Sequence, residues 1–291
     1  MSEQVCMTGA EYCGGAAGVD TCGYPVETTG NTVLDILEHR SSTRAFARDD
    51  DDRPVAVTDE QRAAILHAAS RAPSAGAMMM YSIVSIREQA TLDRLADLCD
   101  YQPMIAKAPW ALIFVVDYAK WIDLFEHVGC FKPEFVERTG KAPRRAPGLG
   151  DFAIAAQDAV IAAQNAVVAA EALGLGSCYI GDIVENAEEV ASLLDLPPYT
   201  MPLSMLIIGT PRKERPAIAH PVVNLAHEER YRRADTATMD AQVAEMDAMF
   251  RPHAREAGER VVDIYTRKHT SPFMAEMSRS MEWWFKNWLG K

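Results

Sequence analysis

Short apolar runs along the chain predict the strands of a central sheet. Residues 110–117, WALIFVVD, are almost wholly apolar, which is typical of a strand buried on both faces. Residues 81–87 and 203–209 are also rich in apolar side chains. We predict a strand over each of these segments.

Apolar residues at helical spacing predict helices around these strands. Over residues 32–39, Val33, Ile36 and Leu37 share one helix face. Arg40 follows at the same spacing, and we expect it at the C-terminal end of this helix.

Capping signals mark the ends of other helices. Thr58 and Gln61 match a capping box that opens an alanine-rich helix, and Pro73 stops it. Asn186 is predicted to cap a further helix that ends at Leu196.

The longest predicted helix covers residues 151–173. Its polar residues recur almost two turns apart and form one narrow stripe: Asp151, Gln157, Asp158, Gln164, Asn165 and Glu171. We expect this helix to be buried on nearly all sides, at the centre of the fold and against a second subunit. The recurring polar residues argue against a membrane-spanning helix.

A last helix is predicted from Ser271, with Pro272 as its first residue. Its large apolar residues fall at helical spacing: Phe273, Met277, Met281, Trp284 and Trp288. Packing against the body of the protein or a partner chain is the favoured role of this stripe. The alternative is that Trp283 or Trp284 contacts a cofactor or substrate.

Composition indicates a folded protein without a general affinity for polyanions. The chain has 291 residues, of which 48% are hydrophobic and 24% charged. Its formal net charge of -12 opposes non-specific binding to nucleic acid or to an anionic membrane. The first residues have neither a basic start nor an apolar run, so we expect no secretory signal and a cytoplasmic protein.

The six cysteines are expected to be reduced thiols. Three are predicted to be buried or half-buried: Cys99, Cys130 and Cys178. Cys6, Cys13 and Cys22 lie in a glycine-rich segment, and their spacing matches neither zinc nor iron–sulfur patterns. We therefore predict an N-terminal arm there and no metal site.

Residues 40–46, RSSTRAF, combine two arginines with three hydroxyl side chains. Guanidinium groups give paired, charge-assisted hydrogen bonds to phosphate, and hydroxyl groups can satisfy its remaining oxygens. The segment is therefore a candidate phosphate site. The alternative is that Arg40 only complements the dipole at the helix C-terminus.

Four segments together resemble the FMN-dependent nitroreductase family, and they occur in family order. They are residues 40–46, 72–76 (APSAG), 171–181 (EALGLGSCYIG) and 208–211 (IGTP). The resemblance implies an α+β fold with a central mixed sheet flanked by helices. It also implies an intertwined homodimer with FMN at the subunit interface. On this basis we expect three parts: an arm over 1–30, an FMN-binding domain over 31–220 and a helical extension over 221–291.

The resemblance implies cations near both ends of FMN. Arg40 and Ser42 match phosphate-binding positions, and Ser41 matches a position beside the phosphate or the ribityl chain. Arg44 matches the basic residue that faces the N1–C2 edge of the flavin ring. A fixed positive charge at that edge favours the reduced cofactor.

A second basic pair, Lys213 and Arg215, matches positions that reach the same phosphate. Arg212 could take the place of Lys213, and the sequence does not choose between them. The alternative is an exposed charged turn.

The loop after the second helix departs from the family pattern. Pro73, Ser74 and Ala75 match positions beside the cofactor, with Ser74 as a candidate hydrogen-bonding residue. Ala77 and Met79 stand where family members usually bring Asn and Gln to the ring edge. Adaptable apolar contacts are expected there instead, and they leave the redox tuning open.

Ile180 and Gly181 match the place where the family's backbone lies near flavin N5, and glycine permits a close approach. Residues 118–150 match an excursion that forms a wall of the substrate channel. Phe125 is its candidate stacking residue, with local packing as the alternative.

The chain has no Gly-x-Gly-x-x-Gly motif after a strand, so NADH or NADPH is expected to dock transiently on the flavin. One site would hold donor and acceptor in turn, which implies ping-pong turnover. The resemblance thus implies an oxidoreductase that passes hydride from NAD(P)H through FMN to a nitroaromatic, a quinone or a related electron-poor small molecule. The alternatives are enone reduction or reductive dehalogenation on the same fold, and a flavin-binding protein without catalytic activity.

Overall fold

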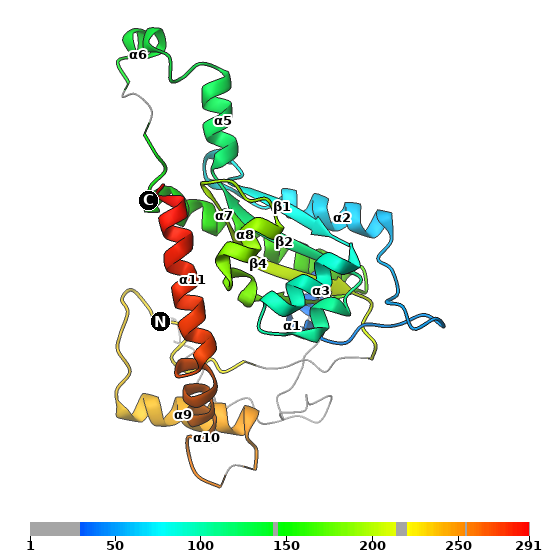
Figure 1. Ribbon diagram of the computed structural model, residues 1–291. Helices are drawn as coiled ribbons and strands as arrows, with labels where there is room; N and C mark the ends of the chain where they lie inside the picture. Colours follow the sequence, from blue (N-terminus) through cyan, green and yellow to red (C-terminus); the bar gives the residue numbers. More distant parts are fainter. Residues whose placement is uncertain (1–29, 142–144, 214–219, 254, 291) are drawn as a thin grey trace. The chain divides into compact units, whose positions relative to one another are not determined.

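The computed structural model describes residues 30–141, 145–213, 220–253 and 255–290. The chain divides into two compact units, which are described separately. One unit contains residues 1–41 and 215–274, and the other contains residues 42–214 and 275–291. The larger unit, with residues 42–214, holds the sheet (Figure 1).

The sheet has four strands: β1 (Tyr81–Ile86), β2 (Trp110–Asp117), β3 (Gly176–Ile180) and β4 (Thr200–Gly209). Their order is β1-β2-β4-β3, so β1 and β3 form its edges. The three predicted strands are confirmed, and β2 matches its predicted bounds. All pairs of described strands are antiparallel, so the predicted mixed sheet is wrong for these residues. β3, with the sequence GSCYI, is an additional strand that the apolar pattern did not predict.

The helices of this larger unit are α2 (Asp59–Ser70), α3 (Gln89–Leu98), α4 (Pro103–Ala106), α5 (Ala119–His127), α6 (Pro133–Thr139), α7 (Leu149–Ala172) and α8 (Ala187–Leu193), with the 3-10 turns η1 (Ala75–Ala77) and η2 (Gly181–Val184). The smaller unit has α1 (Thr32–His39), α9 (Thr236–Phe250), α10 (Glu259–Ile264) and the π-helical turn η3 (Tyr265–His269). Helix α11 (Pro272–Trp288) begins in the smaller unit and belongs to the larger one from Ala275 onward.

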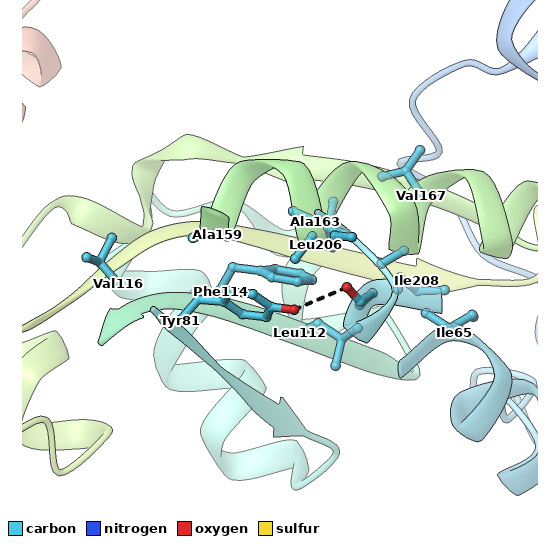
Figure 2. Close-up of a cluster of buried hydrophobic side chains, with 14 of the residues drawn as sticks. Ile65, Tyr81, Leu112, Phe114, Val116, Ala159, Ala163, Val167, Leu206 and Ile208 are labelled. Carbon is cyan, nitrogen blue, oxygen red and sulfur yellow. Dashed lines mark hydrogen bonds between the residues drawn. The ribbon is translucent and has the colours of Figure 1, made fainter. Parts of the chain in front are cut away.

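Strand β2 separates two hydrophobic cores because its side chains alternate between the faces of the sheet. Leu112, Phe114 and Val116 belong to the core that also contains residues of α2 and α7. The other core is formed with α3, α8 and α11, and its β2 members are Ala111, Ile113 and Val115. Figure 2 shows the first core, where the Tyr81 hydroxyl donates to the Ala69 carbonyl oxygen at 3.2 Å.

Helix α7 has one buried face and one exposed face within this chain. The buried positions are mostly alanines: Ala155, Asp158, Ala159, Ala162, Ala163, Ala166, Val167 and Ala170. Ile154, Val160 and Ile161 are 44%, 47% and 39% exposed. The single chain therefore buries only one face of α7, and burial of the other face against a second subunit stays a prediction. By length and composition α7 could cross a membrane, but its alanine face packs on the sheet, as in the core helix of a soluble protein.

The polar stripe of α7 connects this helix to its neighbours. The Asn165 side chain donates to the Ala68 carbonyl oxygen of α2 at 3.1 Å. The Tyr179 hydroxyl of β3 donates to the Gln164 amide oxygen at 3.4 Å. The stripe therefore fixes α7 against both α2 and the sheet.

The capping predictions have mixed outcomes. Thr58 and Gln61 form the predicted capping box at the start of α2. Asn186 precedes α8 as predicted, but its backbone is left-handed at φ 46° and its side chain does not cap the helix. Helix α8 ends at Leu193, not at Leu196.

The two terminal helices of the prediction also differ in outcome. Helix α1 has its predicted bounds, but Val33 and Leu37 are 55% and 46% exposed, so its apolar face is not buried in this chain. Helix α11 buries Trp284 and Trp288 completely. Packing as the role of the α11 stripe is therefore confirmed for these two residues.

Candidate functional site

Two of the predicted basic segments lie side by side at the β3 edge of the sheet. The Thr43 backbone N–H donates to the Ser177 carbonyl oxygen of β3 at 2.8 Å. The Arg212 N–H donates to the Ala45 carbonyl oxygen at 3.0 Å, and Phe46 forms a β-bridge with Pro211. The structure thus brings residues 42–46 next to residues 211–213.

Gly209 explains the glycine of the IGTP motif. A Cβ atom on Gly209 would lie 2.8 Å from Cδ1 of Phe46 and 2.7 Å from Cγ of Pro109. Because no side chain fits there, Phe46 packs directly on the end of β4. This contact holds residues 42–46 against the sheet.

The cations of these two segments are exposed. Arg44, Arg212 and Lys213 form no ion pair with any described residue. Elsewhere arginines do have carboxylate partners, as in the pair of Arg145 with Asp151 at 2.6 Å. In a chain with a formal net charge of -12, three exposed cations on adjacent segments, without an ion pair among the described residues, favour an anionic ligand.

The hydroxyl side chains of the same segment also fit an anion. Ser42 is half-buried. The Thr43 hydroxyl is buried and has no hydrogen-bond partner in the described part of the chain. A buried polar group without a partner is costly, so a ligand that supplied one would be stabilised here.

The remaining phosphate candidates belong to the smaller unit or fall outside the described residues. Arg40 and Ser41 belong to the smaller unit, where the Arg40 N–H donates to the Ile36 carbonyl oxygen and ends α1. Their roles stay predictions. Arg215 lies outside the described residues, as do Cys6, Cys13 and Cys22.

A buried carboxylate of α7 holds the loop that contains the predicted ring contacts. Asp158 is 2% exposed. Its Oδ1 accepts the Ala75 N–H at 2.9 Å, and its Oδ2 accepts the Met80 N–H at 3.2 Å. Asp158 therefore clamps both ends of the loop with one side chain. The sequence marked Asp158 only as part of a polar stripe, and an acid on an otherwise buried face was the signal of this second role.

The loop between these bonds has an uncommon backbone. Ala77 and Met79 have positive φ angles of 56° and 48°, in the left-handed region that non-glycine residues seldom adopt. The Ser74 hydroxyl accepts the Met79 N–H at 3.1 Å and keeps its own hydrogen to donate. Ala75, Ala77 and Met79 are exposed, so this loop offers small and apolar side chains to a ligand.

Strand β3 and the loop share a support in α7. Gln164 contacts β3 and Asp158 holds the loop, and Gln164 is six positions after Asp158, a rise of about 9 Å along the helix. Ile180 at the end of β3 is buried, and Gly181 beyond it is exposed. A Cβ atom on Gly181 would have no heavy atom within 4 Å, so the space beside this backbone is open.

The predicted excursion is tied to the loop by an aromatic residue. The Trp121 indole N–H donates to the Met78 carbonyl oxygen at 2.9 Å. Phe125 lies between Trp121 and Phe131, with ring centroids 5.5 Å and 6.3 Å away. The contacts of Phe125 within the chain are therefore local packing, and its stacking on a substrate stays a prediction.

The described cysteines match their predicted burial. Cys99 and Cys178 are buried, and Cys130 is half-buried. Burial, together with the nearby charges of Asp182 and Glu185, raises the pKa of the Cys99 thiol far above its usual range. Cys99 is thus a packing residue and not a nucleophile.

Comparison with known proteins shows which family this chain resembles. A sequence profile described as Nitroreductase family matches residues 37–210. A Bacillus subtilis protein named FMN reductase, NAD(P)H, is 32% identical over 215 residues, which cover 73% of this chain and 79% of that protein. An oxygen-insensitive NADPH nitroreductase of Salmonella typhimurium is 32% identical over 219 residues, which cover 73% and 81%. The structure of NfrA1 from B. megaterium has a TM-score of 0.72 at 25% identity and covers 87% of this chain and 98% of its own.

Proposed function

This chain belongs to the nitroreductase family, and from that membership and its site we propose that it is an NAD(P)H-dependent FMN oxidoreductase. FMN supplies the redox chemistry by accepting and returning hydride. The protein's own part is to bind the cofactor, to set its charge environment and to shape the acceptor site.

The observation that carries this proposal is the adjacency of residues 42–46 and 211–213. The Arg212 N–H bond to Ala45 and the bridge of Phe46 with Pro211 hold the two backbones side by side, and both segments carry exposed cations. A terminal phosphate carries the charge that such a group of cations and hydroxyls binds best. Ser42 and Lys213, or Arg212 in its place, are therefore assigned to the FMN phosphate and Arg44 to the N1–C2 edge of the ring, with Arg40, Ser41 and Arg215 as further phosphate candidates by resemblance.

Other residues are assigned to the flavin ring. Ile180 and Gly181 offer backbone with open space beside it. Pro73, Ser74 and Ala75 offer the start of the Asp158-clamped loop, while Ala77 and Met79 offer small and apolar contacts. Fewer polar groups at the ring edge favour acceptors that need no specific hydrogen bond.

The acceptor is proposed to be an electron-poor small molecule such as a nitroaromatic or a quinone, reduced in ping-pong turnover. Relatives have names that point to different acceptors: the B. subtilis protein to FMN, the Salmonella protein to nitro compounds, and a Pseudomonas relative, 27% identical, to Cr(VI). This variety supports an open acceptor site. Free flavin belongs in any acceptor panel for this enzyme. We also propose that the protein is soluble and cytoplasmic.

A purified preparation is expected to contain FMN and not FAD, because the assigned cations suit a terminal phosphate. Acid release followed by chromatography identifies the flavin. Anaerobic addition of NADH or NADPH to the yellow protein is then expected to bleach it rapidly. Predominant FAD, or a protein that does not take up FMN, contradicts the cofactor; persistent colour favours the flavin-binding alternative without catalysis.

A homodimer that uses the exposed face of α7 is also proposed. Ile154, Val160 and Ile161 leave an apolar surface that a second copy would cover.

We expect the wild type to sediment as a dimer and Ile161→Lys to sediment as a folded monomer with less FMN. Tyr101→Asn, at an 80% exposed side chain, is the control and should stay dimeric. A monomeric wild type with bound FMN contradicts this proposal. Ala163 and Val167 are unsuitable for this test because they are buried within the subunit.

A further inference from the structure

The C-terminal helix α11 lies beyond the residues 37–210 that match the family profile, yet it is bonded to the turn that follows β3. Trp284 is completely buried, and its indole N–H donates to the Val184 carbonyl oxygen at 2.9 Å. Val184 is the last residue of η2, and Gly181 is the first. Helix α11 therefore contacts the same short turn that carries the backbone assigned to the flavin ring.

Two further side chains of α11 hold the residues after this turn. Glu276 Oε1 accepts the Asn186 N–H at 3.2 Å, and Ser280 Oγ accepts the Ala187 N–H at 3.2 Å. The Ser280 hydroxyl also donates to Glu276 Oε1 at 2.7 Å. N–H groups at a helix start have no partner inside the helix. Because the Asn186 side chain does not cap α8, α11 supplies these acceptors.

Ion pairs fix Glu276 in this arrangement. Arg279 donates to both oxygens of Glu276 at 2.9 Å and to both oxygens of Glu188 at 2.8 Å. The hydrogen bonds from Arg279 lower the pKa of Glu276 to about 2, so this carboxylate stays ionised throughout the neutral range.

The other side of the same segment is held by the region of α3 and α4. The Asn186 side chain donates to the Leu98 carbonyl oxygen at 2.8 Å, and the Gln102 side chain donates to Asp182 Oδ2 at 2.7 Å. Residues 182–187 are thus bound from two sides. At the Gly181 end, an added Cβ atom would have no heavy atom within 4 Å.

We propose that Trp284 is a positioning residue, through which α11 sets the place of the Gly181–Val184 backbone against the flavin ring. The inference rests on the proposed function. A displacement of about 1 Å at reacting groups can cost about a hundredfold in rate, so one hydrogen bond to this turn can matter for hydride transfer. Trp284 acts from behind the turn and does not touch the cofactor.

The test compares Trp284→Phe with Trp283→Phe in the full-length holoprotein. Trp284→Phe keeps an aromatic ring but removes the indole N–H that Val184 accepts. Trp283 packs edge-on against Trp284 with ring centroids 5.0 Å apart, and no hydrogen bond joins its indole to a described residue, so it is a matched control. Both variants are saturated with FMN before reduction by NAD(P)H is followed anaerobically.

We expect Trp284→Phe to reduce the rate constant for flavin reduction at least about tenfold and to shift the midpoint potential of the flavin. Backbone hydrogen exchange at residues 181–187 should accelerate, while exchange in β2 should stay unchanged. Trp283→Phe should change the rate constant for flavin reduction by no more than about twofold, and the exchange at residues 181–187 by no more than about twofold. Ser280→Ala, which removes a smaller side chain, should accelerate exchange over the same residues and provides a second variant if Trp284→Phe does not fold.

A lower melting temperature with normal reduction, potential and exchange would show that Trp284 is only a packing residue and would overturn the inference. A wild type that binds no FMN or is not reduced would instead refute the proposed function. Hydrogen exchange would still report whether Trp284 and Ser280 fix the turn.

Discussion

Asp158→Asn is expected to release the loop that carries the ring contacts and to weaken both folding and FMN binding. The substitution keeps the size of the side chain but places an amide NH2 where one carboxylate oxygen accepts a backbone N–H. Either the Ala75 or the Met80 N–H then faces another donor. A buried donor that loses its partner costs about 1–3 kcal/mol, so the free energy of unfolding should fall by about that amount.

Chemical denaturation and an FMN titration measure the two effects. We expect the dissociation constant of FMN to rise at least about tenfold, because 1.4 kcal/mol corresponds to a factor of ten. Asp97→Asn is the matched control, since it makes the same chemical change at an exposed side chain of α3. Equal FMN affinity in Asp158→Asn and the wild type would show that the loop does not contribute to cofactor binding.

Local patterns were sufficient for the elements that their own residues determine. The apolar run of 110–117 predicted β2 because a strand covered on both faces needs apolar residues at every position. Thr58 and Gln61 predicted the start of α2 because a capping box involves only neighbouring residues. Of the four segments that resemble the family, parts of three lie side by side at β3: residues 42–46, 176–180 and 209–211.

Features that depend on distant contacts were missed or mistaken. Asn186 has the residue type of a cap, but its side chain binds Leu98 and the caps come from α11, about ninety residues away. The polar stripe of α7 did not reveal that Asp158 serves a loop about eighty residues earlier. No periodicity encodes such pairings, because the partner lies on another element. The sequence pattern of α7 likewise does not show that the sheet covers only one of its faces, because this depends on how the helix packs in the fold.

The two ends of the proposed flavin site should respond differently to loss of charge. Arg40→Ala is expected chiefly to weaken FMN retention, because a phosphate contact holds the oxidised and reduced cofactor about equally. Arg44→Ala, measured with saturating FMN, is expected chiefly to slow reduction by NAD(P)H, because charge at the N1–C2 edge favours the reduced form and its transition state. Loss of one charged contact is worth about 1.5–3 kcal/mol, so each effect should be at least about tenfold.

Anaerobic stopped-flow reduction and an FMN titration on both variants separate these effects. Arg87→Ala is the control, because Arg87 is exposed and follows β1 at the opposite edge of the sheet from β3. Arg44 already lies beside residues 211–213 without a carboxylate partner among the described residues, so its removal disturbs no ion pair of the fold. A slower reduction in Arg44→Ala at unchanged stability would therefore report on the flavin. Normal FMN affinity and normal reduction in both variants would instead mean that Arg40 only complements the dipole of α1 and that Arg44 is an ordinary surface charge.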